Sequence, residues 1–392
     1  MDVTLQNALL LLLIASVVAM VCRRLRLPYS AGLVAAGLSL AALPFAPRMV
    51  LTQDLIFTLL LPPLLFEAAL YLDWRQVGRD FPVIGTLATL GVVISAAITA
   101  AGMHLAAHWE WPSAIVFGAL IAATDPVSVI ATFRDAKAQG RLLVLIESES
   151  LLNDGTAAVA FAVVVAVLAG HSVTPVDVAA MLARMVGGGV LCGAAVGLGA
   201  SLLAWRTQDH LVEITLTTIA AYGSFLLADQ LGTSGVLATI TAGMTMASLS
   251  RRGVLSERGQ EAVRAFWEYG AFVANSVIFL LIGVSGEARR FPLVASIVAI
   301  VVVTLSRAAS IYPCCLLFSR GRLRVAAKHQ HAMFWGGLRG AVALALALGL
   351  PPFIPHRSEI EAVSFAVVAF SVFGQGLTMA PLLRRIGEIR QG

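Results

Sequence analysis

Thirteen apolar segments, each about as long as a helix must be to cross a bilayer, set the strongest constraint on how this 392-residue chain can fold. Backbone N–H and C=O groups find no water inside the bilayer, so a spanning chain forms helices or a closed barrel. Hydrophobic residues make up 59% of the chain and charged residues 12%, against about 25% charged residues in a soluble domain. We therefore predict an all-α integral membrane protein with about thirteen transmembrane helices. The spans are approximately 5–22, 28–43, 50–71, 81–107, 112–133, 141–169, 177–204, 211–229, 235–250, 260–284, 291–319, 325–350 and 357–383.

Basic residues indicate which loops face the cytoplasm. If the N-terminus lies outside, the loops on the inner side hold most of the 27 Lys and Arg residues. Cytoplasmic loops of membrane proteins carry such an excess. The sequence thus predicts a multi-pass protein of the cell (inner) membrane with its N-terminus outside and its C-terminus in the cytoplasm. Because the net charge of +5 follows from this loop pattern, nucleic acid is not an expected partner.

The rest of the composition excludes several classes of protein. No segment is long or polar enough for a soluble domain, so residues 1–392 are predicted to form a single membrane domain. The four cysteines lie in apolar runs without metal-ligand spacing. No nucleotide-binding loop follows a predicted strand. We therefore expect no cofactor and no enzyme activity.

Two of the predicted spans are interrupted in mid-membrane. The fifth contains Thr124-Asp125-Pro126, and the twelfth contains three glycines around Arg339. Proline cannot donate a helical hydrogen bond, and irregular backbone at this depth is tolerated only where it lines an enclosed cavity. With the seventh span as a linker, we predict that spans 1–6 and 8–13 form two inverted repeats whose broken fifth helices cross, a pattern typical of transporters. Ordinary kinks would not need a charge, whereas Asp125 can offset the partial positive helix ends and Arg339 the partial negative ones.

The sixth span carries two carboxylates, Glu149 and Asp154, within an apolar run. A charged side chain in hydrocarbon costs roughly 2.5–3.5 kcal/mol on the insertion scale, so it marks a functional site by default. On a helix, Ser150 and Asp154 share one face, and Glu149 and Asn153 share the neighbouring face. Such a group of oxygen atoms suits a small hard cation or a proton.

Two further ionisable residues are predicted to lie in the membrane. Glu67, in the third span, is either a cation ligand, which we favour, or a structural hydrogen-bond acceptor. Arg307 is an isolated cation in the eleventh span, and a buried unpaired cation is costly. We expect it to pair with a carboxylate, for which Glu149 is the candidate. That pairing would leave Asp154 free to exchange protons.

These stretches resemble the sodium–proton exchangers of the monovalent cation/proton antiporter superfamily over essentially the whole chain. The motifs that carry the resemblance are Thr124-Asp125-Pro126, the stretch from Glu149 to Asp154 and the stretch from Trp335 to Ala341. Asn153, directly before Asp154, is similar to the branch with Asn-Asp in place of Asp-Asp. The resemblance implies secondary active transport of a monovalent cation against a proton.

The resemblance also implies roles for individual residues. Asp154 would bind Na⁺ and H⁺ in competition, and Asn153 would support the site through hydrogen bonds. The cation shell would be completed by Ser150, Glu67 and the backbone carbonyl of Thr124. The remaining charges would pair or compensate one another: Glu149 with Arg307, and Asp125 and Arg339 at the crossed breaks.

The family has a homodimeric scaffold and a mobile core. By analogy, the core comprises spans 3–6 and 10–13 (about 50–169 and 260–385), and the dimer-side scaffold comprises spans 1–2 and 7–9 (about 5–43 and 177–250). The resemblance thus implies a homodimer in the lipid bilayer. Because the sequence ends a few residues after the last span, regulation through a long cytoplasmic tail is not expected.

The expected function is exchange of Na⁺ or Li⁺ for H⁺ by alternating access. If Asp154 must carry either a proton or a cation each time the site changes from one side of the membrane to the other, the exchange is 1:1 and electroneutral. Two alternatives stay open. A K⁺/H⁺ antiporter could use the same fold, because selectivity among oxygen-ligated cations depends on fine geometry. A passive cation channel would use similar acids, but it would not need paired broken helices.

Overall fold

The computed structural model describes residues 2–25, 27–41, 51–72, 74–125, 130, 133, 140–170, 174–287 and 292–389. These residues are nearly all helical, and they contain no strand beyond one isolated bridge between Asp125 and Leu338. The α-helices and the three π-helical segments (η) are α1 (Asp2–Leu25), α2 (Tyr29–Ala41), η1 (Leu55–Leu60), α3 (Leu61–Tyr71), α4 (Trp74–Thr86), η2 (Leu87–Gly91), α5 (Val92–Ala106), α6 (Trp111–Ile121), α8 (Arg141–Leu168), α9 (Pro175–Ala204), α10 (His210–Gln230), α11 (Gly235–Ser250), α12 (Glu257–Glu287), α13 (Leu293–Leu316), α14 (Ala327–Trp335), α15 (Ala341–Leu348), α16 (Arg357–Phe370), η3 (Ser371–Gly376) and α17 (Leu377–Arg385).

The helices correspond in order to the predicted spans. Within the described residues, eight helices are long and apolar enough to cross a membrane, and four shorter apolar helices accompany them. The twelfth predicted span is divided into α14 and α15, with the break at 336–340. The fifth begins as α6, and its predicted continuation through residues 126–128 lies outside the described residues. The predicted all-α membrane fold is confirmed, and so is the interruption of the twelfth span.

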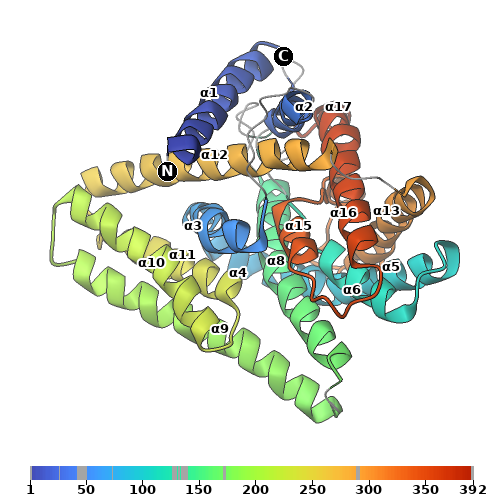
Figure 1. Cartoon of the computed structure of the whole chain (residues 1–392). Coiled ribbons are helices and arrows are strands. Elements are labelled where there is room, and N and C mark those ends of the chain that lie inside the picture. The colour runs from blue at the N-terminus through green and yellow to red at the C-terminus, as the bar shows by residue number, and fades with distance from the viewer. Residues whose placement is uncertain are drawn as a thin grey trace.

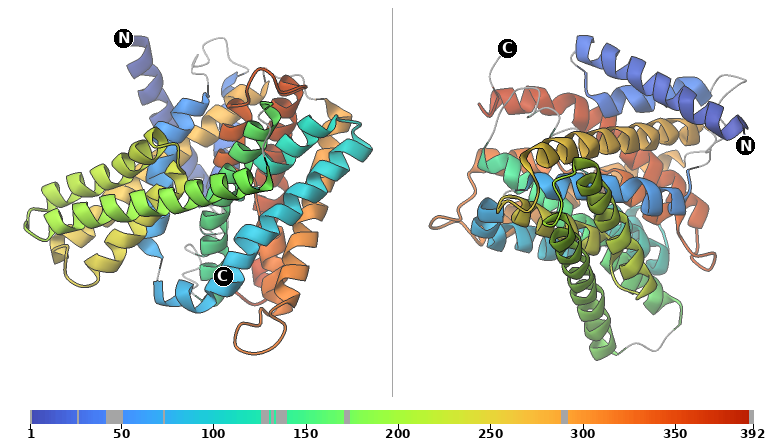
Figure 2. Two further views of the ribbon diagram at one scale, coloured as in Figure 1. Left: turned by 90° about the horizontal axis from the view of Figure 1, so that it is seen from below. Right: turned by 90° about the vertical axis from the view of Figure 1, so that its left-hand side faces the viewer.

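The helices form two neighbouring groups. Helices α9, α10 and α11 pack against one another, and α12 crosses the molecule above them in the view of Figure 1. Helices α5, α6, α13, α15 and α16 form the other group, with α3, α4 and α8 between the two (Figures 1 and 2). The interrupted helices α6 and α14–α15 belong to the second group.

Local sequence signals fix where the helices of the first group begin. The Thr174 hydroxyl accepts a hydrogen bond from the Asp177 N–H, and the Asp177 carboxylate accepts one from the Thr174 N–H, which makes a capping box for α9. Asp209 and Ser234 cap α10 and α11 through their side chains. These side chains satisfy backbone donors that a helix start leaves unpaired.

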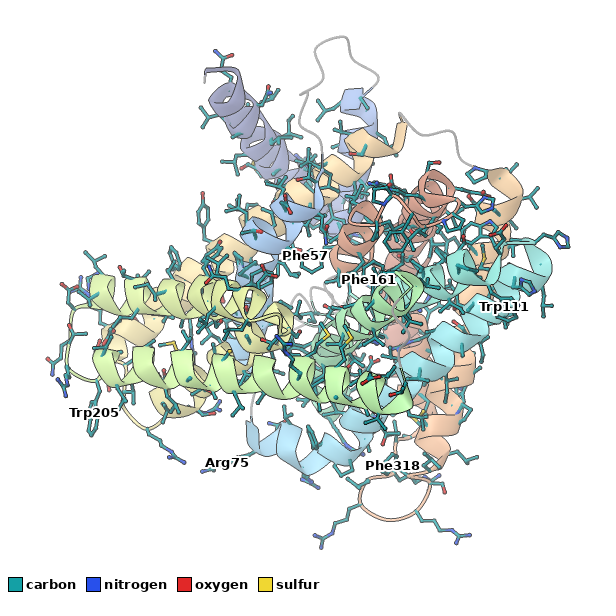
Figure 3. All side chains as sticks on the ribbon, turned by 60° about the horizontal axis from the view of Figure 1, so that its bottom comes forward. Phe57, Arg75, Trp111, Phe161, Trp205 and Phe318 are labelled. Carbon is teal, nitrogen blue, oxygen red and sulfur yellow. The ribbon has the colours of Figure 1, made fainter. Side chains whose placement is uncertain are left out.

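One edge of the molecule gathers three of the basic loops that were predicted to lie inside. Arg141, at the start of α8, donates to the Asp80 carboxylate of α4 at 2.7 Å and to the carbonyl oxygen of Arg324 at 2.7 Å. Figure 3 shows Arg75 and Phe318 at this same edge of the molecule. Three loops assigned to one side from their charge therefore do meet on one side.

Helices α2 and α12 approach until their backbones touch. A Cβ atom on Gly37 would lie 2.2 Å from the carbonyl oxygen of Leu280, and one on Gly283 would lie 2.3 Å from that of Val34. Real Cβ atoms do not approach other atoms so closely, so glycine is required on both helices. Small residues that allow such close packing are typical of helix pairs in membranes.

The packing of α3 and α12 bears on the predicted division into core and scaffold. The prediction groups both helices with the core, yet α12 packs most closely on α2, and α3 packs most closely on α11. Trp267 of α12 also donates a hydrogen bond to Thr217 of α10 at 2.9 Å. Close packing thus links α3 and α12 to helices of the predicted scaffold, and the boundary between the two parts stays a prediction.

Candidate functional site

The two interrupted spans meet at their breaks. The backbone N–H of Asp125, just after α6, donates to the carbonyl oxygen of Leu338, between α14 and α15, at 2.8 Å. This pairing satisfies backbone groups that neither broken helix can bond internally, which the interior of a membrane requires. The second break is also held by η3, because the Ser371 hydroxyl accepts from the backbone N–H of Arg339 at 3.0 Å. The crossing is therefore held by main-chain atoms.

The charges at the crossing lie opposite the helix ends that they can neutralise. Arg339 donates from Nη1 to the carbonyl oxygens of Ala122 and Ala123, at 2.7 and 3.1 Å, and these carbonyls close the C-terminal end of α6. The carboxylate of Asp125 lies against Gly340, where a Cβ atom would come within 2.1 Å of Oδ2. Gly340 is the N-cap of α15, so this carboxylate faces the partial positive end of that helix.

Helix α8 is fixed to the first break by two hydroxyl groups. The Oγ of Ser150 lies 2.9 Å from the Oγ1 of Thr124, and it also donates to the Thr124 carbonyl oxygen. Both side chains are buried, with 2% exposed in each case. Ser150 and the Thr124 carbonyl, two of the predicted cation ligands, are thus in direct contact.

Asp154 and Glu67 face a common cavity of about 390 Å³, which Thr124 and Asp125 also line. Among the described residues, none gives the Asp154 carboxylate a hydrogen bond or an ion pair. The walls are otherwise largely apolar side chains of α3, α12 and α15. A carboxylate in these surroundings can take up a proton or a small cation.

Glu149 points away from this cavity and pairs with Arg307. The pair is bidentate, with Arg307 Nη1 at 2.8 Å from Oε1 and Nη2 at 2.9 Å from Oε2 of Glu149. Asn153 donates from Nδ2 to Oε1 of the same carboxylate at 3.2 Å. Parallel bonds to a guanidinium are the strong form of this interaction. The structure thus contains the Glu149–Arg307 pair expected from the sequence, and it places Asn153 beside that pair.

The cavity collects only part of the predicted cation shell. Asp154, Glu67 and Thr124 line it, whereas Ser150 and Asn153 do not. Ser150 contacts Thr124, which lines the cavity, whereas Asn153 donates to Glu149, which does not line it. No group of three or more His, Cys, Asp or Glu side chains in the described part of the chain is placed to hold a resident metal ion.

Two acidic residues outside the sequence motifs also line the cavity. Glu147 precedes Asp154 by seven positions on α8, and Glu268 lies on α12 and accepts a hydrogen bond from Tyr71. The separation of seven is itself a signal, because positions i, i+4 and i+7 share one helix face. That face runs from Glu147 through Leu151 to Asp154, and all three line the cavity.

Comparison with known proteins agrees with this architecture. A family model described as sodium/hydrogen exchanger, transmembrane, matches residues 10–385. The chain belongs to the sodium/hydrogen exchanger family. This confirms the resemblance drawn from the motifs, and it places the chain among transporters, not enzymes.

Individual members of the exchanger family match most of the chain. The Na⁺/H⁺ antiporter ApNhaP of Aphanothece halophytica is 38% identical over 374 residues, which cover 93% of this chain and 70% of the relative. The Na⁺/H⁺ antiporter NhaP of Pseudomonas aeruginosa is 33% identical over 355 residues, covering 86% and 82% of the two chains. The structure of the sodium proton antiporter MjNhaP1 from Methanocaldococcus jannaschii at pH 8 matches with a TM-score of 0.76 at 20% identity, over 97% of this chain and 95% of that one. The last comparison supports the fold.

Proposed function

We propose that this protein exchanges Na⁺ or Li⁺ for H⁺ across the cell membrane, with Asp154 as the shared site of the cation and the proton. The observation that carries the proposal is the Asp154 carboxylate, which lines the cavity beside the crossing of two broken helices and has no hydrogen bond or ion pair with the described residues. The names of the relatives, Na⁺/H⁺ antiporters, support the choice of ions. A carboxylate that binds either the cation or the proton, but not both at once, couples the movements of the two ions across the membrane.

The cation shell that we propose combines Asp154, Glu67 and the carbonyl oxygen of Thr124, with Ser150 as a fourth ligand. Hard monovalent cations prefer such oxygen ligands over nitrogen or sulfur. Asn153 supports the site by holding Glu149, which pairs with Arg307 and so stays out of proton transfer. Asp125 and Arg339 keep the crossing close to neutral when a cation enters or leaves.

We propose that the structure corresponds to an inward-facing state of an alternating-access cycle. The cavity reaches from Asp154 to Arg23 in the last turn of α1 and to Tyr29 at the start of α2. These ends adjoin a basic loop that the charge pattern assigns to the cytoplasm. The same pattern favours an N-terminus outside and a C-terminus inside. A homodimeric scaffold with a mobile core remains our proposal for the moving parts.

Exchange of one cation for one proton moves no net charge. Membrane voltage, worth about 2.3 kcal/mol per charge per 100 mV, then contributes nothing, and the driving force is the difference between the two gradients, about 1.4 kcal/mol per tenfold ratio. A K⁺/H⁺ antiporter is the alternative on the same site. A passive cation channel is less well supported, because it has no need of a proton that competes for Asp154.

The test is proton efflux from acid-loaded proteoliposomes on addition of Na⁺, Li⁺ or K⁺. Wild type is compared with Asp154→Asn and with Asp229→Asn, an exposed aspartate at the end of α10 that serves as a matched control. We expect Na⁺ and Li⁺ to release protons from wild type and the control only, at a rate that does not change when the voltage is collapsed. Proton release on addition of K⁺ alone would show that the transported cation is K⁺ and not Na⁺ or Li⁺. Exchange by Asp154→Asn at the wild-type rate would overturn the role of Asp154.

A further inference from the structure

A small cavity of about 10 Å³ is lined by the two buried arginines, Arg307 and Arg339, and shares no lining residue with the cavity that Asp154 lines. Its polar lining comes from α13, from the break between α14 and α15, and from η3. These residues are Thr304 and Arg307 of α13, Arg339 at the break, and Ser371 and Gln375 of η3. Neither the proposed exchange nor the charge compensation at the crossing uses this cavity.

Two hydrogen-bond donors that line this cavity have no acceptor among the described residues. Arg307 and Arg339 are 6% and 2% exposed, and the unbonded groups are Nε of the first and Nη2 of the second. Other donors of the same guanidinium groups are bonded, to Glu149 and to the carbonyls of α6. Leaving a buried donor unsatisfied is destabilising, and more so when the group is charged. The two side chains therefore favour a hydrogen-bond acceptor in the space between them.

Acceptors converge on the same space. Gln375 is 6% exposed, and no described residue makes a hydrogen bond with its side-chain amide. The hydroxyl of Thr304 donates to the carbonyl oxygen of Ile300 at 2.7 Å, which leaves its oxygen able to accept. Two donors and two acceptors thus surround one small volume. A molecule that both accepts and donates hydrogen bonds satisfies all of them.

We propose that one water molecule is bound here and joins Arg307, Arg339 and Gln375. The volume of about 10 Å³ matches the space that a single buried water needs, and such waters make about three hydrogen bonds. An anion is a poorer fit, because Glu149 already neutralises Arg307, and the Ala122 and Ala123 carbonyls with Asp125 nearby already face Arg339. A neutral ligand leaves this balance unchanged.

The water gives Gln375 a positioning role at the crossing. The water, held by Gln375, binds Nη2 of Arg339. Nη1 of the same guanidinium then points at the carbonyl oxygens that end α6. Gln375 lies in η3, a π-helical segment, and such segments occur frequently at functional sites. The water therefore links η3 and α13 to the break through hydrogen bonds. This inference is independent of the ions that the protein transports.

The experiment is a density map of the full-length protein in lipid, at a resolution that shows ordered water, for wild type, Gln375→Met and Gln375→Glu. In wild type we expect a peak within hydrogen-bond distance of Arg307 Nε, Arg339 Nη2 and the Gln375 amide. Gln375→Met should lose the peak and lower Tm by a few degrees, since it keeps the volume and removes the acceptor. Gln375→Glu, which keeps an acceptor oxygen, should retain the peak. The exposed Gln230→Met serves as the control.

Two results would overturn the inference. One is a wild-type map with both guanidinium groups resolved and no peak between them. The other is an anomalous signal at this position from crystals grown in bromide, which would assign an anion. If Gln375→Met fails to fold, Thr304→Val tests the same water through its second acceptor, with a weakened peak expected.

Discussion

Nη1 of Arg339 lies 2.7 Å from the carbonyl oxygen of Ala122, so the guanidinium from the second broken span closes the C-terminal end of the first. Helix ends leave carbonyl groups unpaired, and the hydrocarbon of a membrane offers them no hydrogen-bond donor. One side chain therefore supplies both the charge and the hydrogen bonds that this helix end lacks. The stability of the crossing then depends on a guanidinium and not simply on a positive charge.

We expect Arg339→Gln to abolish exchange and to destabilise the protein. Hydrogen bonds to a charged group are each worth about 1.5–3 kcal/mol, and Arg339 makes two of them to α6. The measurement is the thermal unfolding of purified protein, together with proton efflux from proteoliposomes. The exposed Arg258→Gln should change neither. A variant Arg339→Gln with wild-type Tm would contradict the capping role.

The Glu149–Arg307 pair predicts a non-additive double mutant. Each of Glu149→Gln and Arg307→Gln leaves one buried charge without its partner, which costs about 3–5 kcal/mol. The double variant removes both charges and should be less destabilised than the sum of the single variants. Unfolding of the three variants and of the exposed Glu261→Gln gives the coupling energy. Strict additivity would show that the two side chains do not stabilise each other.

Substitution by alanine should change Tm in opposite directions at two glycines, Gly337 and Gly199. A Cβ atom on Gly337 would lie 2.4 Å from Nε of Arg307, so Gly337→Ala must displace the guanidinium that holds Glu149. At Gly199 of α9, nothing among the described residues beyond the local backbone of α9 lies within 4 Å of the position that a Cβ would take, and alanine there should stabilise the helix by about 0.5–1 kcal/mol. Tm should fall for the first variant and rise for the second. Equal shifts would show that the contact at Gly337 is not restrictive.

Glu388 makes stability depend on pH at the C-terminal end of the chain. Burial raises the pKa of Glu388, but hydrogen bonds and charge from Lys328 and His329 outweigh it, so the net pKa lies below the ordinary value of 4.5. A lowered folded-state pKa contributes stability above the unfolded-state pKa, and this stability is lost as pH falls through the folded-state pKa. The contribution is about 1 kcal/mol or less, because the pair is near the surface.

The matching measurement compares Tm of wild type and Glu388→Gln as a function of pH. Wild type should be more stable at neutral pH by a constant amount, and the difference should shrink below about pH 4.5. Lys328→Gln should reduce the difference in the same range. A difference that instead grows on acidification would reverse the sign of the linkage and exclude this role for Glu388.

Much of the architecture follows from patterns along the sequence. Apolar length and basic loops predict the order and number of the spans, because the bilayer leaves a chain few alternatives. Arg307 and Glu149 could be paired from the sequence because each is costly alone in hydrocarbon. The two breaks could be predicted because glycine and proline interrupt a helix wherever they occur along a membrane span.

Other features depend on how each helix is rotated about its axis and which helices it packs against. The hydrophobic periodicity of the sequence does not determine either. The sequence places Ser150 and Asp154 on one face of α8, yet Ser150 bonds Thr124 while Asp154 faces the cavity. The contact of α12 with α2 could not be predicted, since helix neighbours depend on the tertiary fold. The grouping of unbonded donors around Gln375 likewise depends on the tertiary fold, because 68 positions separate it from Arg307.

The backbone contact between Gly37 and Gly283 has a consequence for genetics. A larger residue at one position pushes the two helices apart, and a lesion of this kind is usually relieved by a smaller residue opposite it. No smaller residue than glycine exists, and each glycine already meets the main chain of the other helix. Revertants of a Gly37 substitution should therefore restore Gly37 itself or map to distant sites, and a selection for second-site suppressors should return none at Gly283.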